Sequence, residues 1–313
     1  MPEYAILTKH ITRDFKTIRA VDDLSLEIPK GVVFGFIGPN GAGKTTTIRL
    51  LLGLLEPTDG CAEVLGFDTR YQAARVREKT GALLEHNGLY ERLNALDNLE
   101  FYGRVYKIPS AELTSRIKEL LSHFDLWDRR KEQVSKWSRG MKQKLSVARV
   151  MLHRPSLIFL DEPTAGLDPV AAASLREDLA RLVSDDGTTV FLTTHNLSEA
   201  EKLCNIVGVI NRGKLLSVGH PDELRSTSGT IKAEITGRGF TSQLIELLRL
   251  KSEVTGVELK NDRLLIELSG DVSIAPLINL MVSEGAEIEE VQKGKATLEE
   301  AFLTLMEEEN NVS

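Results

Sequence analysis

The chain has 313 residues, of which 42% are hydrophobic and 27% charged, and its formal net charge is −7. This length allows one large domain or two smaller ones, and the composition is that of an ordinary globular protein. No apolar stretch approaches the length of about 18 residues that spans a bilayer, no secretion signal is visible, and the charge argues against nucleic acid as a partner.

The first elements are predicted to be antiparallel strands. Ala5–Leu7 and the alternating residues 24–28 are the candidates, and a turn at Pro29–Gly31 leads into the apolar run Val32–Ile37. This run is short and apolar enough for the interior of a sheet. Beyond the helix that follows, the pattern predicts a turn at 57–60, a strand at 62–65 and a polar helix near 72–79.

Directly after Val32–Ile37, the sequence fits the phosphate-binding pattern G-x-x-x-x-G-K-[ST], and helical spacing resumes at Ile48. Lys44 is expected to neutralise the β- and γ-phosphates, Thr45 to hold a magnesium ion and Thr46 to reach a further phosphate oxygen. The alternative is a glycine-rich turn that binds nothing, which the complete motif and both flanks disfavour. The residues predicted to bind a nucleoside triphosphate are Gly38, Pro39, Asn40, Gly41, Ala42, Gly43, Lys44, Thr45 and Thr46.

Residues 88–150 change character, because Leu, Glu, Lys and Arg recur there at helical periods. We expect a helical insert in an otherwise α/β domain that covers residues 1–219. The candidates for its buried face are Leu96, Leu99, Val105, Leu113, Ile117, Leu120, Leu121 and Phe124. The sheet is expected to resume at 157–160, 190–193 and 206–210, and a turn at 211–213 leads into a strand at 214–218.

Two acids follow the buried strand at 157–160. Asp161 is expected to hold the metal ion through water, and Glu162 to orient or deprotonate the attacking water. The competing explanation is a solvated acid that only caps the next helix. His195 follows another strand, where a neutral imidazole can reach a γ-phosphate, although an isolated histidine there is more often a packed or capping residue.

Together these motifs resemble the nucleotide-binding subunit of an ATP-binding cassette (ABC) transporter over residues 4–219, and the phrase LDEPTAGLDP is highly specific. The resemblance implies that Phe15 stacks on adenine and that His195 is the switch histidine. It places Glu85 where the family has a glutamine that touches magnesium and the attacking water. Asp168 ends the loop that contacts a second subunit.

The resemblance also places Trp137–Met141 at the family's signature, usually Leu-Ser-Gly-Gly-Gln. Ser138 and Gly140 then open a helix, predicted at Met141–Leu152, and form a second anion site that closes over ATP held by a partner chain. Two copies in head-to-tail contact would bury two ATPs. The simpler alternative is that Ser138 only caps its helix.

Four positions depart from the family pattern: Trp137, Arg139 and Met141 within the signature, which alter the rim but keep the two atoms that touch phosphate, and Glu85. Arg139 could add a phosphate contact or a salt bridge to the partner, and Met141 replaces the usual glutamine and alters the rim of the site. Glu85 can still bind magnesium, but its charge lies near the γ-phosphate. Either turnover is slower as a result, or a nearby base offsets the charge.

Residues 220–313 carry 18 Asp or Glu against 9 Lys or Arg, and alternating strand and helix patterns suggest a small split βαβ domain of the α+β class. This segment resembles the C-terminal extension of drug-, polyketide- or polysaccharide-type exporter subunits, with Leu298–Leu303 as its closing motif. Its expected role is regulatory or substrate-linked, or else that of a dimer-stabilising or solubilising lobe.

The resulting prediction is an ATPase subunit that uses ATP and magnesium, pairs with a second ATP-binding subunit and powers export through a separate membrane permease. Coupling is expected through the Glu85 loop and Gly88–Tyr90. Cys61 and Cys204 lack metal-ligand spacing, which favours inert thiols in a reducing cytoplasm. The resemblance implies that the chain lies at the inner face of the cell membrane. The alternatives are a soluble ABC ATPase that serves a non-transport assembly and an unrelated kinase or GTPase; the absence of an Asn-Lys-x-Asp motif opposes the latter.

Overall fold

The computed structural model describes residues 4–85, 87–227, 231–260, 263–270, 272–295 and 297–312. The chain divides into two compact units, Met1–Gly219 (unit 1) and His220–Ser313 (unit 2). Among the described helices, none combines the length and apolar character needed to cross a membrane. Unit 1 contains all the residues predicted to bind the nucleotide.

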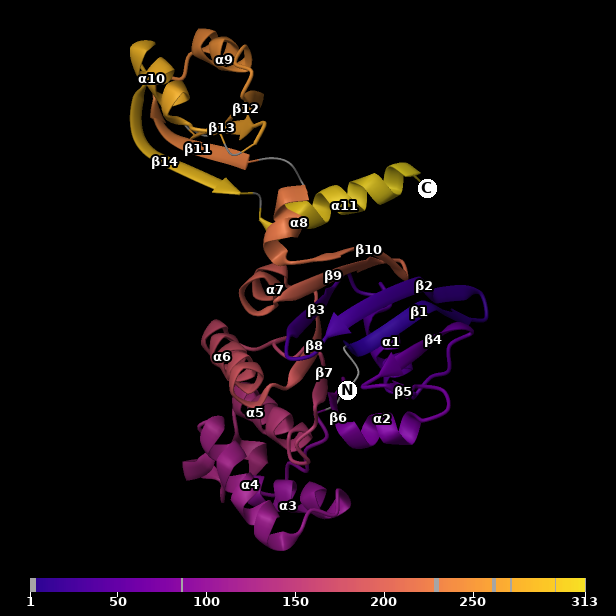
Figure 1. Cartoon of the computed structure of the whole chain (residues 1–313). Helices are drawn as coiled ribbons and strands as arrows, with labels where there is room; N and C mark the ends of the chain where they lie inside the picture. The colour runs from indigo at the N-terminus through magenta and orange to yellow at the C-terminus, as the bar shows by residue number, and fades with distance from the viewer. Residues whose placement is uncertain are drawn as a thin grey trace. The chain divides into compact units, whose positions relative to one another are not determined.

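A six-stranded sheet forms the centre of unit 1, in the order β10-β9-β3-β8-β7-β6 (Figure 1). Its strands are β3 (Val33–Ile37), β6 (Thr80–Leu83), β7 (Leu157–Asp161), β8 (Thr189–Thr194), β9 (Ile206–Asn211) and β10 (Lys214–Gly219). All neighbouring pairs are parallel except β9 with β10. Since the predicted loop follows β3 and Asp161 ends β7, both lie at the carboxyl edge of this sheet.

The N-terminal strands belong to a second, antiparallel sheet in the order β2-β1-β4-β5, as the alternation predicted. Its strands are β1 (Tyr4–Phe15), β2 (Ile18–Pro29), β4 (Asp59–Val64) and β5 (Phe67–Asp68). The inward residues of β1 and β2, such as Ile6 and Leu24, are fully buried and share one core with Phe34 and Phe191 of the central sheet. The P-loop α/β fold with an antiparallel edge is therefore confirmed.

Phe191 lies at the middle of an aromatic group in this core, with its ring centroid 5.2, 5.6 and 5.5 Å from those of Phe34, Phe36 and Phe159. Phe191→Ala is expected to lower the free energy of unfolding by about 3–5 kcal/mol, because it removes a buried ring and leaves a cavity. Urea unfolding followed by circular dichroism measures this. The control Val170→Ala, at a side chain that is 78% exposed, is expected to stay within about 0.5 kcal/mol. A similar small loss for both variants would contradict the expectation.

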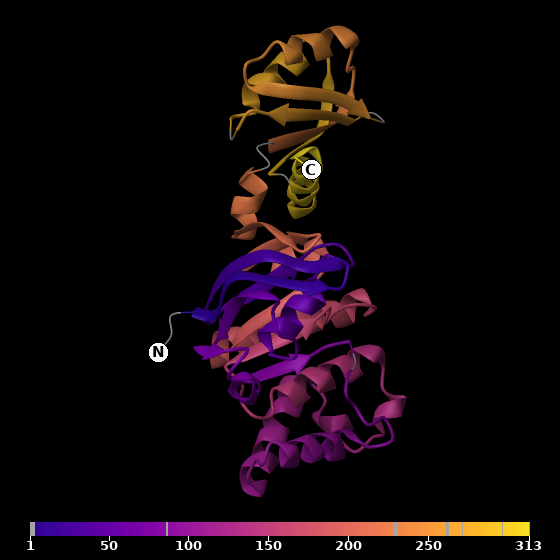
Figure 2. The ribbon, with the colours of Figure 1, turned by 90° about the vertical axis from the view of Figure 1, so that its right-hand side faces the viewer.

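The helices of unit 1 are α1 (Lys44–Leu51), α2 (Ala73–Lys79), α3 (Ala95–Val105), α4 (Ser110–His123), α5 (Arg139–Val150), α6 (Pro169–Asp186) and α7 (Leu197–Leu203), with 3-10 turns at Trp127–Arg129 and Val134–Lys136. In Figures 1 and 2, α3 and α4 lie at one end of unit 1, away from the antiparallel sheet. The predicted helical insert is thus present at 95–150.

Most of the predicted buried face of this insert is correct, including Leu99, Leu113 and Phe124. Val105 is an error, because its side chain is 60% exposed. Gly103 faces α4, where an added Cβ would lie 2.2 Å from Leu113 Cδ1. Val105 lies two residues further along α3 and therefore points to the opposite side of the helix.

The two cysteines differ in exposure: Cys61 is exposed on β4, whereas Cys204 is buried at the end of α7. Burial raises the pKa of the Cys204 thiol to about 12. Because a thiol reacts as the thiolate, the folded chain at pH 8 is expected to react at one thiol with a maleimide, and the unfolded chain at two. Mass spectrometry of the labelled chain measures this, and rapid labelling of Cys204 in the folded chain would contradict it.

Unit 2 has a four-stranded antiparallel sheet in the order β12-β13-β11-β14, with α9 and α10 on one of its faces (Figures 1 and 2). Its elements are α8 (Pro221–Thr227), β11 (Ile231–Arg238), α9 (Ser242–Arg249), β12 (Val254–Lys260), β13 (Arg263–Leu268), α10 (Ala275–Ser283), β14 (Glu287–Lys295) and α11 (Leu298–Val312). Its own core contains Ile235, Leu248 and Met281. This is the predicted split βαβ arrangement of the α+β class.

Candidate functional site

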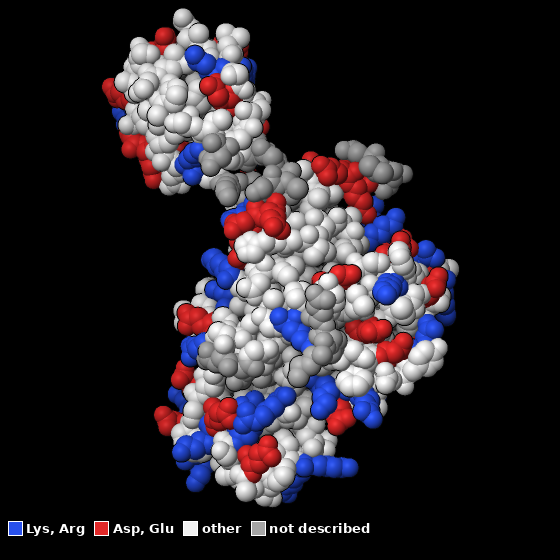
Figure 3. Space-filling view, viewed as in Figure 1, with Lys and Arg blue, Asp and Glu red and all other residues white. Residues whose placement is uncertain are grey.

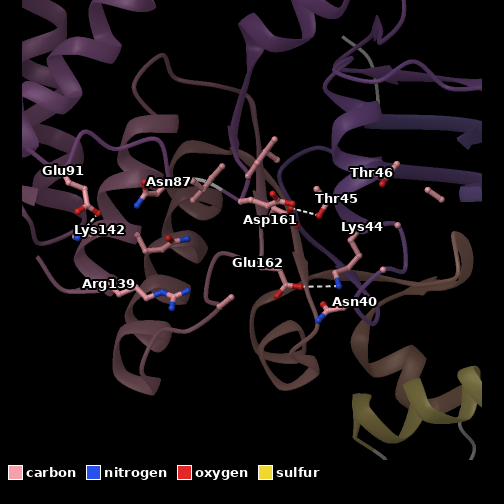
Figure 4. A pocket seen from close by; sticks show the side chains of 18 residues that line it. Asn40, Lys44, Thr45, Thr46, Asn87, Glu91, Arg139, Lys142, Asp161 and Glu162 are labelled. Atoms are coloured by element: carbon pink, nitrogen blue, oxygen red, sulfur yellow. Dashed lines mark hydrogen bonds and ion pairs between the residues drawn. The ribbon is translucent and has the colours of Figure 1, made fainter. Parts of the chain in front are cut away.

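A cavity of about 770 Å³ opens at the carboxyl edge of the central sheet (Figure 4). Five segments line it: Ala20 of β2, the phosphate loop with the start of α1, the end of β6 with the segment after it, the start of α5, and the end of β7 with the residues that follow. Ligands of open α/β sheets bind at this edge because the loops beyond the strands meet there. On the face of unit 1 shown in Figure 3, acidic and basic side chains are interspersed rather than segregated.

The loop between β3 and α1 needs glycine at two positions. An added Cβ at Gly38 would lie 2.2 Å from Ile210 O, and one at Gly43, where φ is +108°, would lie 2.4 Å from Ala20 O. Gly43 is the N-cap of α1 and provides no side-chain cap. The N–H groups of the first turn of α1 are therefore uncapped by a side chain, which suits an anion.

Lys44 is buried and folded back over this loop. Its Nζ donates to Gly38 O at 2.7 Å and to Pro39 O at 3.2 Å, and lies 3.3 Å from Glu162 Oε1. Three oxygens from two segments thus hold the ammonium group in place. A phosphate oxygen at the mouth of the loop can replace them, because it offers the same charge-assisted contact.

Two hydroxyl groups hold the carboxylate of Asp161 at the end of β7. Thr45 Oγ1 donates to Asp161 Oδ2 at 2.7 Å, and Thr193 Oγ1 donates to Oδ1 at 2.5 Å. A threonine hydroxyl and a carboxylate are hard oxygen donors of the kind that magnesium prefers. The donor set at this point therefore fits a magnesium ion that is completed by phosphate oxygens and water.

Glu162 lies between the lysine and the histidine. Its Oε2 is 2.6 Å from His195 Nδ1, while Oε1 contacts Lys44. The backbone of Glu162 has φ +51°, and its N–H is shared between the carbonyl and the hydroxyl of Thr193, each at 3.1 Å. A non-glycine residue held in this conformation carries strain of the kind that clusters at functional sites. Glu162 is thus fixed at the backbone, with its carboxylate placed between two partners.

Glu85 lines the same cavity and pairs with Arg49 of α1, at 3.6 Å between Oε1 and Nη2. The Glu85 side chain is 64% exposed, so we attribute little stability to this ion pair. A base beside Glu85 was one of the two outcomes that the sequence left open.

Ser138 caps α5, since its Oγ accepts from Met141 N at 3.2 Å. The helix begins at Arg139, two residues before the predicted start, and ends at Val150, two residues before the predicted end. The start was placed too late because an N-cap serine is followed at once by helical residues.

Asp168 caps the next helix, α6, by accepting from Val170 N at 3.1 Å and Ala171 N at 2.9 Å. The first turns of α5 and α6 pack closely together. A Cβ added at Gly140 would lie only 2.8 Å from Ala171 Cβ. The signature segment and the predicted dimer loop are therefore neighbours within one chain.

Phe15 lies at the end of β1 and is 39% exposed, with the guanidinium of Arg13 4.7 Å from its ring centroid. It does not line the cavity, although Ala20 does. Of the predicted site residues, the cavity lining includes Asn40, Gly41, Gly43, Lys44, Thr45, Thr46, Glu85, Arg139, Asp161 and Glu162. Those outside it are Phe15, Gly38, Pro39, Ala42, Ser138, Gly140, Met141, Asp168 and His195.

The sequence reasoning missed several residues that line the cavity. Lys142 Nζ lies 2.9 Å from Glu91 Oε1, and Asn87 and Gln143 line the same cavity. The position of Lys142 and Gln143 in the first turn after the signature could have indicated them. Glu91 carried no local signal, because its partner is 51 positions away.

Comparison with known proteins points to one family. The family described as ABC transporter matches residues 21–165. The daunorubicin resistance ATP-binding protein DrrA3 of Streptomyces coeruleorubidus is 36% identical over 100% of this chain and 99% of its own length. The bacitracin transport ATP-binding protein BcrA of Bacillus licheniformis is 32% identical over 96% of this chain and 97% of its own.

Among solved structures, cbiO1 of Clostridium perfringens, part of the ABC transporter complex cbiONQ, superposes with a TM-score of 0.68. It is 22% identical and covers 80% of this chain and 96% of its own. The dimeric, post-hydrolysis structure of the ATP-binding cassette MJ0796 with ADP and Pi has a TM-score of 0.62, 24% identity and coverages of 69% and 98%. At these identities the solved structures support the fold alone.

Proposed function

Since this chain belongs to the family of ABC transporter ATP-binding proteins, we propose that it hydrolyses ATP in the cavity of Figure 4 to power export through a separate membrane subunit. The observation that carries the proposal is the placement of Glu162 between Lys44 and His195, beside the Thr45–Asp161 pair. Relatives named for daunorubicin resistance and bacitracin transport favour export as the direction.

Binding begins with an exchange of partners at Lys44. The triphosphate enters the loop, and its β- and γ-oxygens replace Gly38 O, Pro39 O and Glu162 as acceptors from Nζ. The N–H groups of the uncapped first turn of α1 add further donors. Thr46 and Asn40, which line the same cavity, are placed for the outer phosphate oxygens.

Thr45 and Asp161 would hold the magnesium ion, and Glu85 is a further oxygen donor at the same cavity. When bound, this ion neutralises charge on the β- and γ-phosphates. The Thr193 hydroxyl fixes the orientation of the Asp161 carboxylate, because it donates to the second carboxylate oxygen. Each of these groups positions the triphosphate before the chemical step.

Glu162 acts as the general base once Lys44 has moved to the phosphates. Its free carboxylate oxygen accepts a proton from a water molecule, whose oxygen attacks the γ-phosphorus in line with the leaving ADP oxygen. The neutral imidazole of His195 has one N–H group, which it shifts from Glu162 to a γ-phosphate oxygen. The bond from the γ-phosphorus to the bridging oxygen breaks, and ADP and phosphate are the products.

A second copy of the chain completes each site in this proposal. The Ser138 hydroxyl and the N–H groups at the start of α5 contact the triphosphate held by the partner, and Asp168 lies at the neighbouring start of α6. The solved dimer of MJ0796 belongs to the same fold. One chain then contributes half of two sites, so turnover requires two chains.

The membrane subunit is proposed to dock beside the segment that follows β6. Tyr90 and Phe101 are 47% and 43% exposed there, with ring centroids 5.0 Å apart, and Tyr102 stacks over Arg149 at 4.9 Å. This exposed aromatic group suits a helix of a membrane protein. Docking there would place the chain at the cytoplasmic face of the membrane.

A pull-down of the tagged chain from detergent-solubilised membranes tests this function. Recovery of a polytopic membrane protein in a fixed ratio is the expected result. Recovery of ribosomes or a scaffold complex, without such a protein, would instead support a non-transport ABC ATPase.

Glu85→Gln is expected to keep ATP binding and to change the ATPase rate by several-fold, because it removes a negative charge beside the γ-phosphate and releases Arg49. A coupled-enzyme assay and titration with a fluorescent ATP analogue measure the two effects. Arg49→Gln, which leaves Glu85 unpaired, serves as the comparison and should shift the rate in the opposite direction. If Glu85→Gln changed neither turnover nor transport, Glu85 would not lie at the reacting centre.

A further inference from the structure

Arg139, the first residue of α5, lies flat against a glycine of another loop in its own chain. An added Cβ at Gly166 would lie 2.3 Å from Arg139 Nη1, 2.5 Å from Cζ and 2.7 Å from Nη2. All three are atoms of the guanidinium group, so the charged plane covers the backbone of Gly166. A side chain at position 166 would have to push the guanidinium aside.

Gly166 belongs to the short loop that joins Glu162 to Asp168. Within it, Ala165 N donates to Glu162 O at 3.1 Å and Leu167 N donates to Thr164 O at 3.1 Å. These two hydrogen bonds close successive turns, so the loop is compact. A short, hydrogen-bonded stretch of backbone therefore links Gly166 to Glu162.

The charge of Arg139 is also not used elsewhere in the cavity. Of the basic side chains that line it, Lys44 pairs with Glu162 and Lys142 pairs with Glu91, whereas Arg139 makes no ion pair with the residues that the structure describes. Figure 4 shows Arg139 and Lys44 on opposite sides of Glu162. A cation that has no ion-pair partner among the described residues is attracted by an anion that arrives beside it.

We propose that Arg139 is a positioning residue that couples the Ser138 end of α5 to Glu162 through Gly166. The proposal rests on the proposed function, in which the partner's triphosphate arrives at Ser138. The guanidinium next to Ser138 then contacts the arriving phosphates while it still covers Gly166, so the triphosphate fixes the loop and holds Glu162 in its working position. Nucleotide in one site thereby controls the base of the other.

The variants Arg139→Ala and Arg139→Lys test this coupling, with Lys136→Ala as control. Lys136 is an exposed cation two residues before Ser138 and lies outside the cavity lining. We expect Arg139→Ala to keep the single-chain affinity for ATP, to lower kcat by about 10- to 100-fold and to abolish the sigmoidal dependence of the rate on ATP. Arg139→Lys should recover only part of kcat, because lysine keeps the positive charge but lacks the planar guanidinium group.

A double-mutant cycle with Gly166→Ala separates coupling from a merely structural effect. The new Cβ pushes the guanidinium aside when Arg139 is present, whereas these three nearest atoms are absent in the Arg139→Ala background. Strain from the left-handed backbone of Gly166, where φ is +70°, is common to both backgrounds and cancels in the cycle. Gly166→Ala is expected to lower kcat about tenfold in the wild-type chain and less than about twofold with Arg139→Ala.

The outcomes distinguish the two proposals. Additive effects on kcat, or a wild-type level of cooperativity in Arg139→Ala, would overturn the coupling while leaving an ATP-hydrolysing chain intact. Failure of the wild-type chain to hydrolyse ATP at all would instead overturn the proposed function.

Discussion

Glu162→Gln is expected to reduce the ATPase rate about 100-fold or more while ATP binding is retained. The amide cannot accept the proton from the attacking water, yet it has nearly the same shape and still fits beside Lys44 and His195. Because Lys44 loses its 3.3 Å ion pair with the carboxylate, ATP affinity should be unchanged or higher. Single-turnover hydrolysis and equilibrium binding measure the two effects.

The same variant should accumulate as a dimer with ATP and magnesium, because hydrolysis no longer converts the ATP-bound dimer into separate chains. Size-exclusion chromatography with light scattering detects it, and the double variant Glu162→Gln with Ser138→Ala, which lacks the hydroxyl proposed to contact the partner's triphosphate, should dimerise more weakly. A chain that stays monomeric at high concentration, with turnover insensitive to Ser138, would refute the two-chain site.

Lys44→Ala is expected to weaken ATP binding by about 100-fold or more, because it removes a buried cation from the point where the β- and γ-phosphates arrive. Hydrolysis should fall below detection at ordinary ATP concentrations. Isothermal titration calorimetry measures the affinity. Lys214→Ala, at a side chain that is 61% exposed on β10, is the matched control and should bind ATP normally.

Thermal unfolding decides whether a loss of binding is specific. Removal of Lys44 also leaves Gly38 O and Pro39 O without the ammonium donor, so a modest decrease in Tm is expected even without ATP. The decisive difference is the increase in Tm on adding ATP and magnesium, which the wild-type chain and Lys214→Ala should show and Lys44→Ala should lose. Equal increases in all three would contradict the role of Lys44.

Local patterns predicted the elements that carry the site because each depends on a short segment. β3, its glycine loop and α1 follow one another in the sequence, and Asp161 and Glu162 end a strand of buried residues. β6 was not predicted, because its four residues, Thr80–Leu83, contain a threonine and a glycine and give no apolar run. Its assignment depends on pairing with β7, a strand distant in the sequence.

Contacts between distant segments were beyond the sequence patterns. The signature departure at Arg139 suggested a contact with phosphate or with a partner, but a spacing of 27 positions gives no sign that its guanidinium covers Gly166. The same holds for Glu85 with Arg49 and for Glu91 with Lys142. Pairings of this kind are set by packing of the helical part on the sheet, which a linear pattern does not contain.

The contacts that Lys44 makes inside its own loop have a consequence for the empty chain. Each acceptor that a triphosphate supplies to the ammonium group replaces one that the protein already provides, so the affinity reflects a difference between two well-satisfied arrangements. The nucleotide-free chain therefore keeps partners for the Lys44 ammonium group, which is not left as an unpaired buried charge. It should remain folded through purification without any nucleotide, in a state that can bind ATP.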